Sequence, residues 1–431
     1  MLVFNQTSLS LREARAIGAY IRFMRKKKHL TQEQVCEGIC SVTYLSKIET
    51  GKVIPNPEII DHLYERLGVT TNSDLKLDFD HLKITLYECR QAFDNVNYPK
   101  AEELYQELNK FEDYFQQEPE FFHQFRLLTF YHRLVTYKMD EAALIFEELS
   151  NIVDQFNQEK QLQFYNYAGI YYGIKQDYSK SLEMLLKAED SMEYLQKKNP
   201  HLMLHLALTY SHLKNSVMAI FYANQALTIF DSELLYLKSI DCKMIIGISY
   251  TRSGNYHAAE KVFKNIYKLG DSLGLNTIRA LALHNLAFNY GFLNNKPLAK
   301  EAYLNSLSFR EENDPKIADT TLYLIDILIE EGNYEDAKTQ LNKLQQYTWL
   351  TKKSKIEMQL AWYKLNHKAF PDDLDDEMNY INYLQEIVIP HYQSMEEKEF
   401  LKKKYKELGE YFYRNRKYKL SSQYLLKLTE T

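Results

Sequence analysis

The chain has 431 residues, of which only 13 are glycine and 9 are proline. These turn formers make up roughly 3% and 2% of the chain, well below their usual shares of about 7% and 5%. A sandwich, barrel or propeller needs more turns than this, so an all-α fold is predicted. With 45% apolar and 26% charged residues, the composition also excludes disorder over most of the chain.

The net charge of −5 is unevenly distributed along the chain. Residues 1–69 hold ten Lys and Arg against seven Asp and Glu, a net charge of +3, so the remainder carries −8. A small basic head on a large acidic body predicts two functions in one chain.

Cysteine usage and hydropathy predict a cytoplasmic protein without a membrane segment. Four cysteines are too few for a disulfide framework in a chain of this length, which favours a reducing compartment. The N-terminus lacks the apolar region and cleavage site of a signal peptide. No apolar run approaches the length of about 18 residues that spans a bilayer.

Four short helical blocks are predicted within residues 1–70. Thr31 and Gln34 have the form of a capping box, which predicts that the second helix begins at Gln32. Gly51 ends the third helix. A basic helix followed by two short helices and a tight turn predicts a helix-turn-helix. The apolar positions are Ile17, Ile21 and Met24, then Val35 and Ile39, then Tyr44, Leu45 and Ile48, and finally Ile59, Ile60, Leu63 and Leu67.

This region resembles the phage-repressor (XRE/Cro-type) helix-turn-helix in the runs LTQEQV and YLSKIETGK and in the Pro-containing start of the next helix. The resemblance implies that Arg25 and Glu49 form a buried ion pair. It also implies base contacts from the third helix and a phosphate contact from the second, because polar side chains read base edges and cations neutralise phosphates. The side chains expected to contact DNA are Arg25, Lys26, Lys27, Gln32, Val42, Thr43, Tyr44, Lys47 and Lys52.

Two cysteines of the head are also spaced for metal binding. Cys36 and Cys40 lie four residues apart on one predicted helix, but no second ligand pair is near them, so packed core thiols are expected instead. No metal site and no cofactor are predicted.

Beyond about residue 78 one pattern recurs, in which an aromatic-rich helix, a polar turn and a helix with an early alanine follow each other. The turns contain Tyr98, Met139, Tyr178, Val217, Tyr256, Pro297, Tyr334 and Tyr418. Their spacing is about 39 residues, except for a last step of two units, which predicts nine repeats.

The G/N-Y-x-x-A turn and the small residue and aromatic that precede it resemble the tetratricopeptide repeat. Gly169, Gly247 and Gly409 are expected to allow close approach of the paired helix. The predicted architecture is a helix-turn-helix domain (1–70), a linker (71–80) and a right-handed α-solenoid of about nine tetratricopeptide-like repeats (81–431) that binds a peptide and dimerises.

A solenoid of this kind presents a concave surface on which an extended peptide can lie. Asparagine side chains suit such a surface, because one amide both donates to and accepts from a peptide backbone. Projection of the repeat places seven candidate peptide-binding residues on or near this face: Gln124, Asn166, Thr251, Arg252, Asn285, Asn289 and Asp326.

The combination of an XRE head with tetratricopeptide repeats resembles the RRNPP family of quorum-sensing regulators, especially its PlcR- and NprR-like members. The resemblance implies a homodimer that binds operator DNA and is switched by a short signalling peptide in the repeat groove. It leaves open whether the peptide favours or opposes DNA binding.

Two other functional classes fit the sequence less well. The segment 206–230 also resembles a repeat of the Rap proteins, which implies an alternative in which the repeats bind a response regulator or another protein partner. An enzyme is not predicted and no catalytic residue is proposed, because the sequence lacks H-E-x-x-H, G-x-S-x-G and a Gly-rich phosphate loop.

Overall fold

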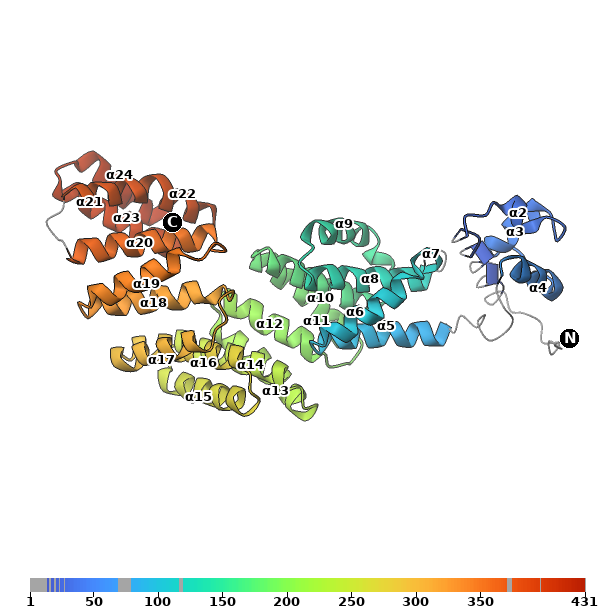
Figure 1. Cartoon of the computed structure of the whole chain (residues 1–431), viewed down its shortest axis with the longest axis horizontal. Coiled ribbons are helices and arrows are strands. Elements are labelled where there is room, and N and C mark those ends of the chain that lie inside the picture. Colours follow the sequence, from blue (N-terminus) through green and yellow to red (C-terminus); the bar gives the residue numbers. More distant parts are fainter. Residues whose placement is uncertain are drawn as a thin grey trace. The chain divides into compact units, whose positions relative to one another are not determined.

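The computed structural model shows an all-α chain (Figure 1). No strand occurs among the described residues, and no helix in that part is long and apolar enough to cross a membrane. Two compact units divide the chain, Met1–Ile245 and Ile246–Thr431. The structure describes residues 14, 17–18, 21–22, 24–26, 28–68, 79–115, 119–369, 374–395 and 397–430.

The head contains α2 (Gln32–Cys36), α3 (Val42–Glu49) and α4 (Pro57–Arg66). The capping box predicted for α2 is confirmed, because Thr31 Oγ1 accepts from the Gln34 amide while the Gln34 side chain accepts from the Thr31 amide. These two hydrogen bonds fix the start of α2, the first helix of the helix-turn-helix.

The head core is made of side chains that its helices turn toward one another. Val35, Leu45, Ile48 and Leu63 are fully buried, in agreement with the predicted apolar positions. Gly38 adopts a φ of 73° between α2 and α3, a left-handed conformation that suits glycine. The predicted helix-turn-helix is therefore confirmed.

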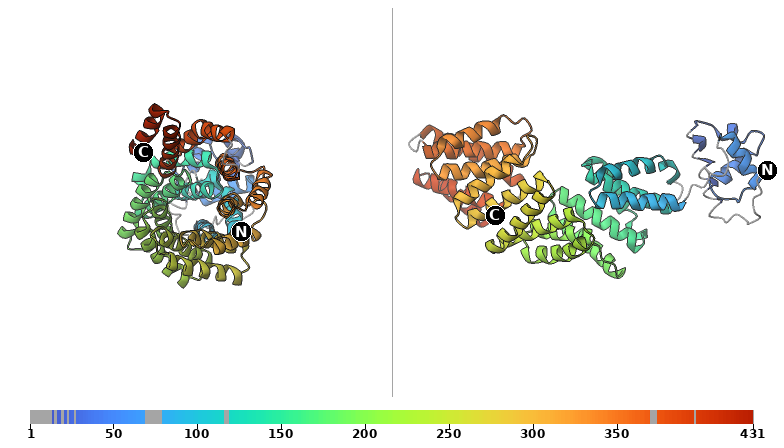
Figure 2. Two further views of the ribbon diagram at one scale, coloured as in Figure 1. Left: turned by 90° about the vertical axis from the view of Figure 1, so that its left-hand side faces the viewer. Right: turned by 60° about the horizontal axis from the view of Figure 1, so that its bottom comes forward.

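Nine pairs of helices follow in the part of the chain that the structure describes, as the spacing of the turns predicts (Figures 1 and 2). The first seven pairs are α5 (Phe79–Asp94) with α6 (Tyr98–Asn109), α8 (Pro119–Val135) with α9 (Met139–Ser150), α10 (Gln158–Ile174) with α11 (Tyr178–Tyr194), α12 (Pro200–His212) with α13 (Ser216–Ser232), α14 (Tyr236–Arg252) with α15 (Tyr256–Ser272), α16 (Asn276–Phe292) with α17 (Lys296–Ser308), and α18 (Lys316–Glu330) with α19 (Tyr334–Gln345).

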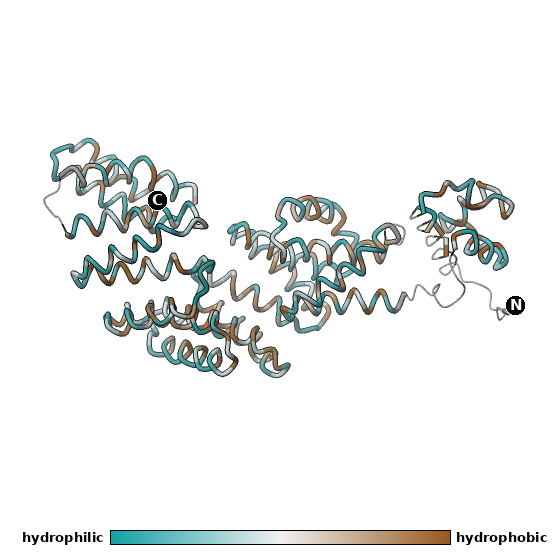
Figure 3. The backbone as a smooth tube through the Cα atoms, viewed as in Figure 1, coloured by the Kyte–Doolittle hydropathy of each residue, from teal (hydrophilic) through white to brown (hydrophobic). Residues whose placement is uncertain are grey.

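The eighth pair has an interrupted second helix, and the ninth closes the described chain. In the eighth, α20 (Lys352–Ala369) precedes α21 (Leu374–Tyr383), the π-helical turn η2 (Leu384–Val388) and α22 (Ile389–Ser394); the ninth pairs α23 (Lys398–Arg414) with α24 (Tyr418–Glu430). Two short elements, α7 (Glu112–Phe115) and η1 (Val153–Gln155), lie between the early pairs. Apolar and polar residues are interspersed along the helices (Figure 3).

Most pairs share one turn geometry. The second helix begins after an Asn or Asp whose side chain accepts a hydrogen bond from the amide three residues later, as Asn215 does from Met218 at 3.2 Å. The residue before this cap has a positive φ, 61° at Lys214. The same cap occurs at Asn97, Asp177, Asn215, Asn255, Asn295 and Asn333.

Glycine sets the distance between paired helices at three sites, as predicted. A Cβ atom added to Gly169 would lie 2.4 Å from a Leu185 methyl carbon. At Gly247 the nearest atom would be a ring carbon of Phe263 at 2.6 Å. The repeat thus needs a residue without a side chain where these helices cross.

Much of the tyrosine excess is repeat core with a polar end. Tyr222, Tyr290 and Tyr392 are buried, yet each hydroxyl donates to a glutamate on a nearby helix. The tyrosine ring contributes buried apolar area, and the hydroxyl is hydrogen-bonded at the edge of the core.

We expect Gly247→Ala to destabilise the repeats by about 1–3 kcal/mol, because the new methyl group overlaps the Phe263 ring. The same substitution at Gly291, on α16, meets nothing within 4 Å. Gly291→Ala should therefore stabilise by about 0.5–1 kcal/mol through helix propensity. Thermal unfolding followed by circular dichroism tests the pair, and shifts of the same sign would contradict the packing argument.

The π-helical turn η2 lies just before Pro390 in a helical run from Leu374 to Ser394. Proline lacks an amide donor and collides with the carbonyl four residues earlier, and a π-turn relieves both problems. The helix therefore continues, and Tyr380 on α21 and Tyr392 on α22 both hydrogen-bond to neighbouring helices.

Candidate functional site

The outer face of α3 carries the predicted base-contacting residues. Val42 is 41% exposed, and Thr43 and Lys47 are also exposed, whereas Tyr44 is half-buried. Ser41 caps the helix by accepting from the Tyr44 amide at 3.1 Å. Lys26 and Lys52 are exposed too, and Lys27 lies outside the described residues. The DNA-contacting role of this set stays a prediction.

Glu49 is buried in the head, where its carboxylate binds Arg25 and Gln32, two of the residues predicted to contact DNA. Arg25 donates to Glu49 through Nε at 2.7 Å and through its second terminal nitrogen at 2.9 Å, which confirms the predicted ion pair. The hydrogen bond to Glu49 is the main cause that raises the pKa of Arg25. Gln32 Nε2 also donates to Glu49, at 2.7 Å. The Arg25 and Gln32 side chains therefore stabilise the head, whether or not they also reach DNA.

Two tertiary contacts of the head were not predicted. Arg66, in the last turn of α4, donates to the carbonyls of Gln34 and Glu37 and so caps the C-terminal end of α2. A Cβ atom at Gly18 would lie 1.8 Å from the Ile48 carbonyl oxygen, so backbone meets backbone there. Both contacts join residues about 30 apart, and local sequence patterns carry no signal for them.

In the first unit, the predicted peptide-binding residues are Gln124 on α8 and Asn166 on α10. Gln124 is half-buried. Asn166 is buried, and its Oδ1 lies 2.8 Å from His205 Nδ1 on α12. Burial lowers the pKa of His205 to about 3, so the ring is neutral and Nδ1 can donate to the amide oxygen.

In the second unit, Asn289 is completely buried and fully engaged. It accepts from Thr251 Oγ1 at 3.1 Å and donates to the Tyr256 carbonyl at 2.9 Å. Asn285 donates to the Leu281 carbonyl within its own helix, and Arg252 is exposed at the end of α14. The bond between Thr251 and Asn289 joins the first helices of neighbouring repeats, and the peptide-binding role of these residues stays a prediction.

The second unit contains a cavity of about 960 Å³ between α16, α18, α20, α21 and α23, which we call the C-terminal cavity. Of the predicted peptide-binding residues, Asp326 lines this cavity. The carboxylates that line the cavity are Asp319, Asp326, Glu357, Glu377 and Glu407, and the cations that line it are Lys353, Lys364, Lys403, Lys404 and Arg414. Sequence reasoning missed all of these except Asp326, because charged residues at helical spacing are also typical of solvated faces.

Several of these charges are paired inside the cavity. Lys364 donates to Asp326 at 2.7 Å and joins α20 to α18. Lys404 donates to Glu407 at 2.9 Å, and the Tyr380 hydroxyl donates to the same carboxylate at 2.6 Å. The Lys364–Asp326 ion pair and the Tyr380 hydroxyl bond to Glu407 therefore connect the helices that form the cavity walls.

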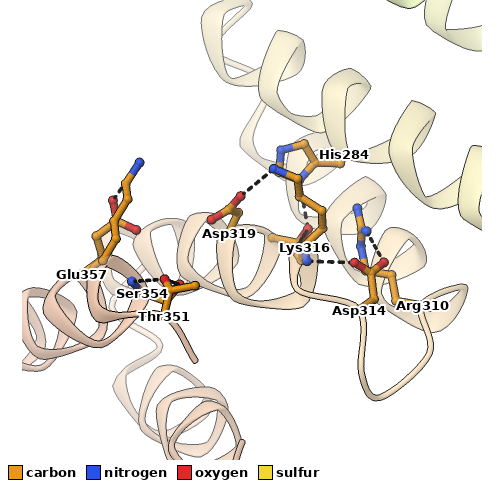
Figure 4. Close-up of polar contacts among 10 residues, drawn as sticks. His284, Arg310, Asp314, Lys316, Asp319, Thr351, Ser354 and Glu357 are labelled. Atoms are coloured by element: carbon orange, nitrogen blue, oxygen red, sulfur yellow. Dashed lines mark hydrogen bonds and ion pairs between the residues drawn. The ribbon is translucent and has the colours of Figure 1, made fainter. Parts of the chain in front are cut away.

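His284, which lines the cavity, faces the start of α18 (Figure 4). Its Nδ1 lies 3.0 Å from Thr320 Oγ1, and burial is the main cause that lowers its pKa to about 4. Asp319 pairs with Lys316 at 3.2 Å. On α20, burial raises the pKa of Glu357 despite the hydroxyl bond from Tyr392.

Side chains that could bind a metal ion are not clustered: among the described residues, no three His, Cys, Asp or Glu side chains are grouped so that they could hold one. Cys36 and Cys89 are buried as free thiols, and burial raises the pKa of Cys89 to about 12.

Comparisons with known proteins agree with this architecture. The helix-turn-helix family matches residues 21–72. The transcriptional activator NprA of Geobacillus stearothermophilus is 26% identical over 401 residues, which cover 90% of this chain and 97% of NprA.

Two structures of NprR share the fold. The apo form of the quorum sensor NprR from B. thuringiensis has a TM-score of 0.68 at 23% identity, covering 81% of this chain and 98% of that one. NprR in complex with its cognate peptide NprX has a TM-score of 0.62 at 21% identity, covering 83% and 98%. The resemblance to the RRNPP family that the sequence predicts is therefore confirmed across the helix-turn-helix and the repeat array.

Proposed function

We propose that this chain is a peptide-responsive transcriptional regulator that binds operator DNA through its head. The observation that carries the proposal is the exposed polar face of α3 on a helix-turn-helix, followed by nine helix pairs in the same chain. NprA, which is similar over nearly the full length of both chains, is a transcriptional activator. We also propose that the protein has no catalytic activity and that it lies in the cytoplasm.

The head has the chemistry of a major-groove reader. Thr43, in the first turn of α3, and Lys47, in its last turn, lie exposed on the helix that would meet base edges. Lys26 and Lys52 are exposed cations in the same domain and suit contacts to phosphates. A homodimer would place two such heads on half-sites about 34–36 Å apart, or a multiple of that spacing.

The repeats are proposed to bind the signalling peptide. NprR binds its cognate peptide NprX, and the repeats of this chain share the NprR fold. Such a peptide shifts DNA binding only if it binds one arrangement of the dimer more tightly than the other. The proposal therefore requires coupling between the groove and the head.

Lys47→Gln is expected to weaken binding to a selected DNA site by about 10- to 100-fold, because one base contact contributes about 1–3 kcal/mol. The site is first obtained by selection of random duplexes on the intact protein. Lys406→Gln, on the exposed face of α23, is the matched control and should leave DNA affinity unchanged. Equal effects of both substitutions in a gel shift would contradict the assignment of α3.

The proposed switch is tested with a peptide that the purified protein retains. Adding this peptide should change the fraction of DNA shifted in the same assay. The same shift at every peptide concentration would contradict the proposed switch. A protein that selects no DNA sequence at all would instead fit the alternative in which the repeats bind a response regulator.

A further inference from the structure

We propose that the connection between α23 and α24, residues 413–420, binds the phosphate backbone of duplex DNA without regard to its sequence. We call these residues the last joint, because they connect the last two described helices (Figure 1). The inference goes beyond the proposed function, which assigns DNA binding to the head alone. It adds a second contact of a different chemical kind.

The charge of the last repeat is opposite to that of the rest of the array. Residues 398–431 hold ten Lys and Arg against four Asp and Glu, a net charge of +6. Residues 70–397 carry −14, because the head contributes +3 and the whole chain carries −5. A polyanion is repelled by most of the array and attracted by its last repeat.

The cations of the last joint are free to bind such a polyanion. All eight residues of the joint are exposed. Four of them are cations: Arg414, Arg416, Lys417 and Lys419. None of the four takes part in an ion pair with any residue that the structure describes. Glu410, the preceding carboxylate on α23, is paired with Lys406 at 3.8 Å, and the first turn of α24 contains no acidic residue.

Backbone hydrogen bonds and aromatic contacts fix the shape of the last joint. The Arg416 amide donates to the Tyr413 carbonyl at 3.0 Å, and the Lys417 amide donates to the Phe412 carbonyl at 2.8 Å. The rings of Tyr413 and Tyr418 meet edge to face with centroids 5.6 Å apart. The Lys417 ammonium lies 6.0 Å from the centroid of the Phe412 ring. The joint is therefore preorganised, which reduces the entropy lost on binding.

Local stability does not explain why cations occupy this joint. Six earlier joints have Asn or Asp at the position that caps the second helix, whereas the last joint has Lys417, whose side chain cannot accept a hydrogen bond. Arg416 has a φ of 56°, in the region that favours glycine. Both positions carry a cation where another residue would stabilise the turn, which indicates a role in binding.

Duplex DNA fits this surface better than an acidic protein does. Interfaces between proteins are depleted in lysine, whereas interfaces with DNA are strongly positive. Phosphate oxygens also accept hydrogen bonds from tyrosine hydroxyls, and Tyr413 and Tyr418 are 64% and 59% exposed. The closely spaced phosphates of a duplex can pair with several cations of one joint at the same time.

The test is the salt dependence with which the intact protein binds a duplex of random sequence. Each phosphate contact releases counterions and contributes about 0.9 to the slope of log affinity against log salt concentration. The triple variant Arg416→Gln, Lys417→Gln and Lys419→Gln should lower this slope by about 2 to 3, and weaken binding at about 0.1 M salt by more than about tenfold. Arg414 stays unaltered, because it also lines the C-terminal cavity.

Lys138→Gln is the matched control and should leave the slope unchanged. Lys138 is exposed at the same position of the joint between α8 and α9, but Asp140 and Glu141 follow it in the first turn of α9. Lys47→Gln should weaken binding to the selected site more than binding to the random duplex. The triple variant should weaken both by the same factor. Circular dichroism verifies that each variant is folded.

Three results would overturn the inference, and they differ in what they leave standing. If the triple variant keeps the slope of the unaltered protein while Lys47→Gln still weakens binding to the selected site, the last joint does not contact DNA and the proposed function stands. If the joint binds poly-glutamate more tightly than a duplex of equal charge, and the triple variant loses that binding, its partner is an acidic protein instead. If the unaltered protein binds no duplex at all, the inference and the proposed binding of operator DNA both fail.

Discussion

Replacing Glu49 with alanine is expected to unfold the head locally, at a cost of about 3–5 kcal/mol. The substitution removes the acceptor of three hydrogen bonds, two from Arg25 and one from Gln32. Arg25, whose side chain is 13% exposed, would keep only the Leu30 carbonyl as a partner. A guanidinium left without its carboxylate in such a place destabilises strongly, because its desolvation is no longer offset.

Hydrogen exchange on the intact protein measures this effect, since the amides of α3 should lose protection while those of the repeats keep it. Glu65→Ala is the matched control, because the Glu65 side chain is 85% exposed on α4. Unchanged protection of α3 in Glu49→Ala would show that the buried pair does not stabilise the head. DNA affinity should fall with the protection.

Acidification from about pH 7 to about pH 5 is expected to destabilise the repeats through two buried histidines, by up to about 2 kcal/mol each. The folded pKa values are about 3 for His205 and about 4 for His284, against about 6.5 in the unfolded chain. Between these values the unfolded chain binds more protons, so stability is complete above about pH 6.5 and falls as the pH is lowered.

The charged groups around the His205 and His284 imidazole rings also favour the neutral form of each ring. His201 and Lys238 face His205, whereas Arg310 acts on His284 and outweighs Asp319. Urea unfolding at the two pH values should show a smaller loss for His205→Gln and for His284→Gln than for the unaltered protein. His257→Gln, with a side chain 85% exposed, serves as the control. Equal losses in all proteins would rule out these histidines as the cause.

The repeats could be predicted from sequence because their signals are local. Turn residues, the alanine after them and the glycine before them recur within one helix pair, and the structure has a helix pair at each predicted turn. The start of α2 at Gln32 followed in the same way from a capping box that spans only four residues.

The sites were harder to predict because they depend on contacts between distant residues. The pair of Arg25 and Glu49 came from a family resemblance, and nothing in the sequence around Arg66 indicates that it caps α2. Likewise, the sequence did not indicate that Asn289, a candidate peptide-binding residue, bonds to Thr251 and Tyr256. Which face of a helix meets solvent or a neighbouring repeat depends on stacking, and that geometry is absent from a period of 39 residues.

The scarcity of glycine leaves an unused reserve of stability in the array. Among the described joints, only Gly254 and Gly332 avoid the penalty of about 1 kcal/mol or more that a side chain brings at the left-handed position before the second helix. Six other joints place a side chain in that conformation: Val96, Tyr137, Gln176, Lys214, Asn294 and Arg416. Replacing these residues with glycine, one after another, would relieve that penalty step by step and so offers a graded series of repeat arrays that differ only at their joints.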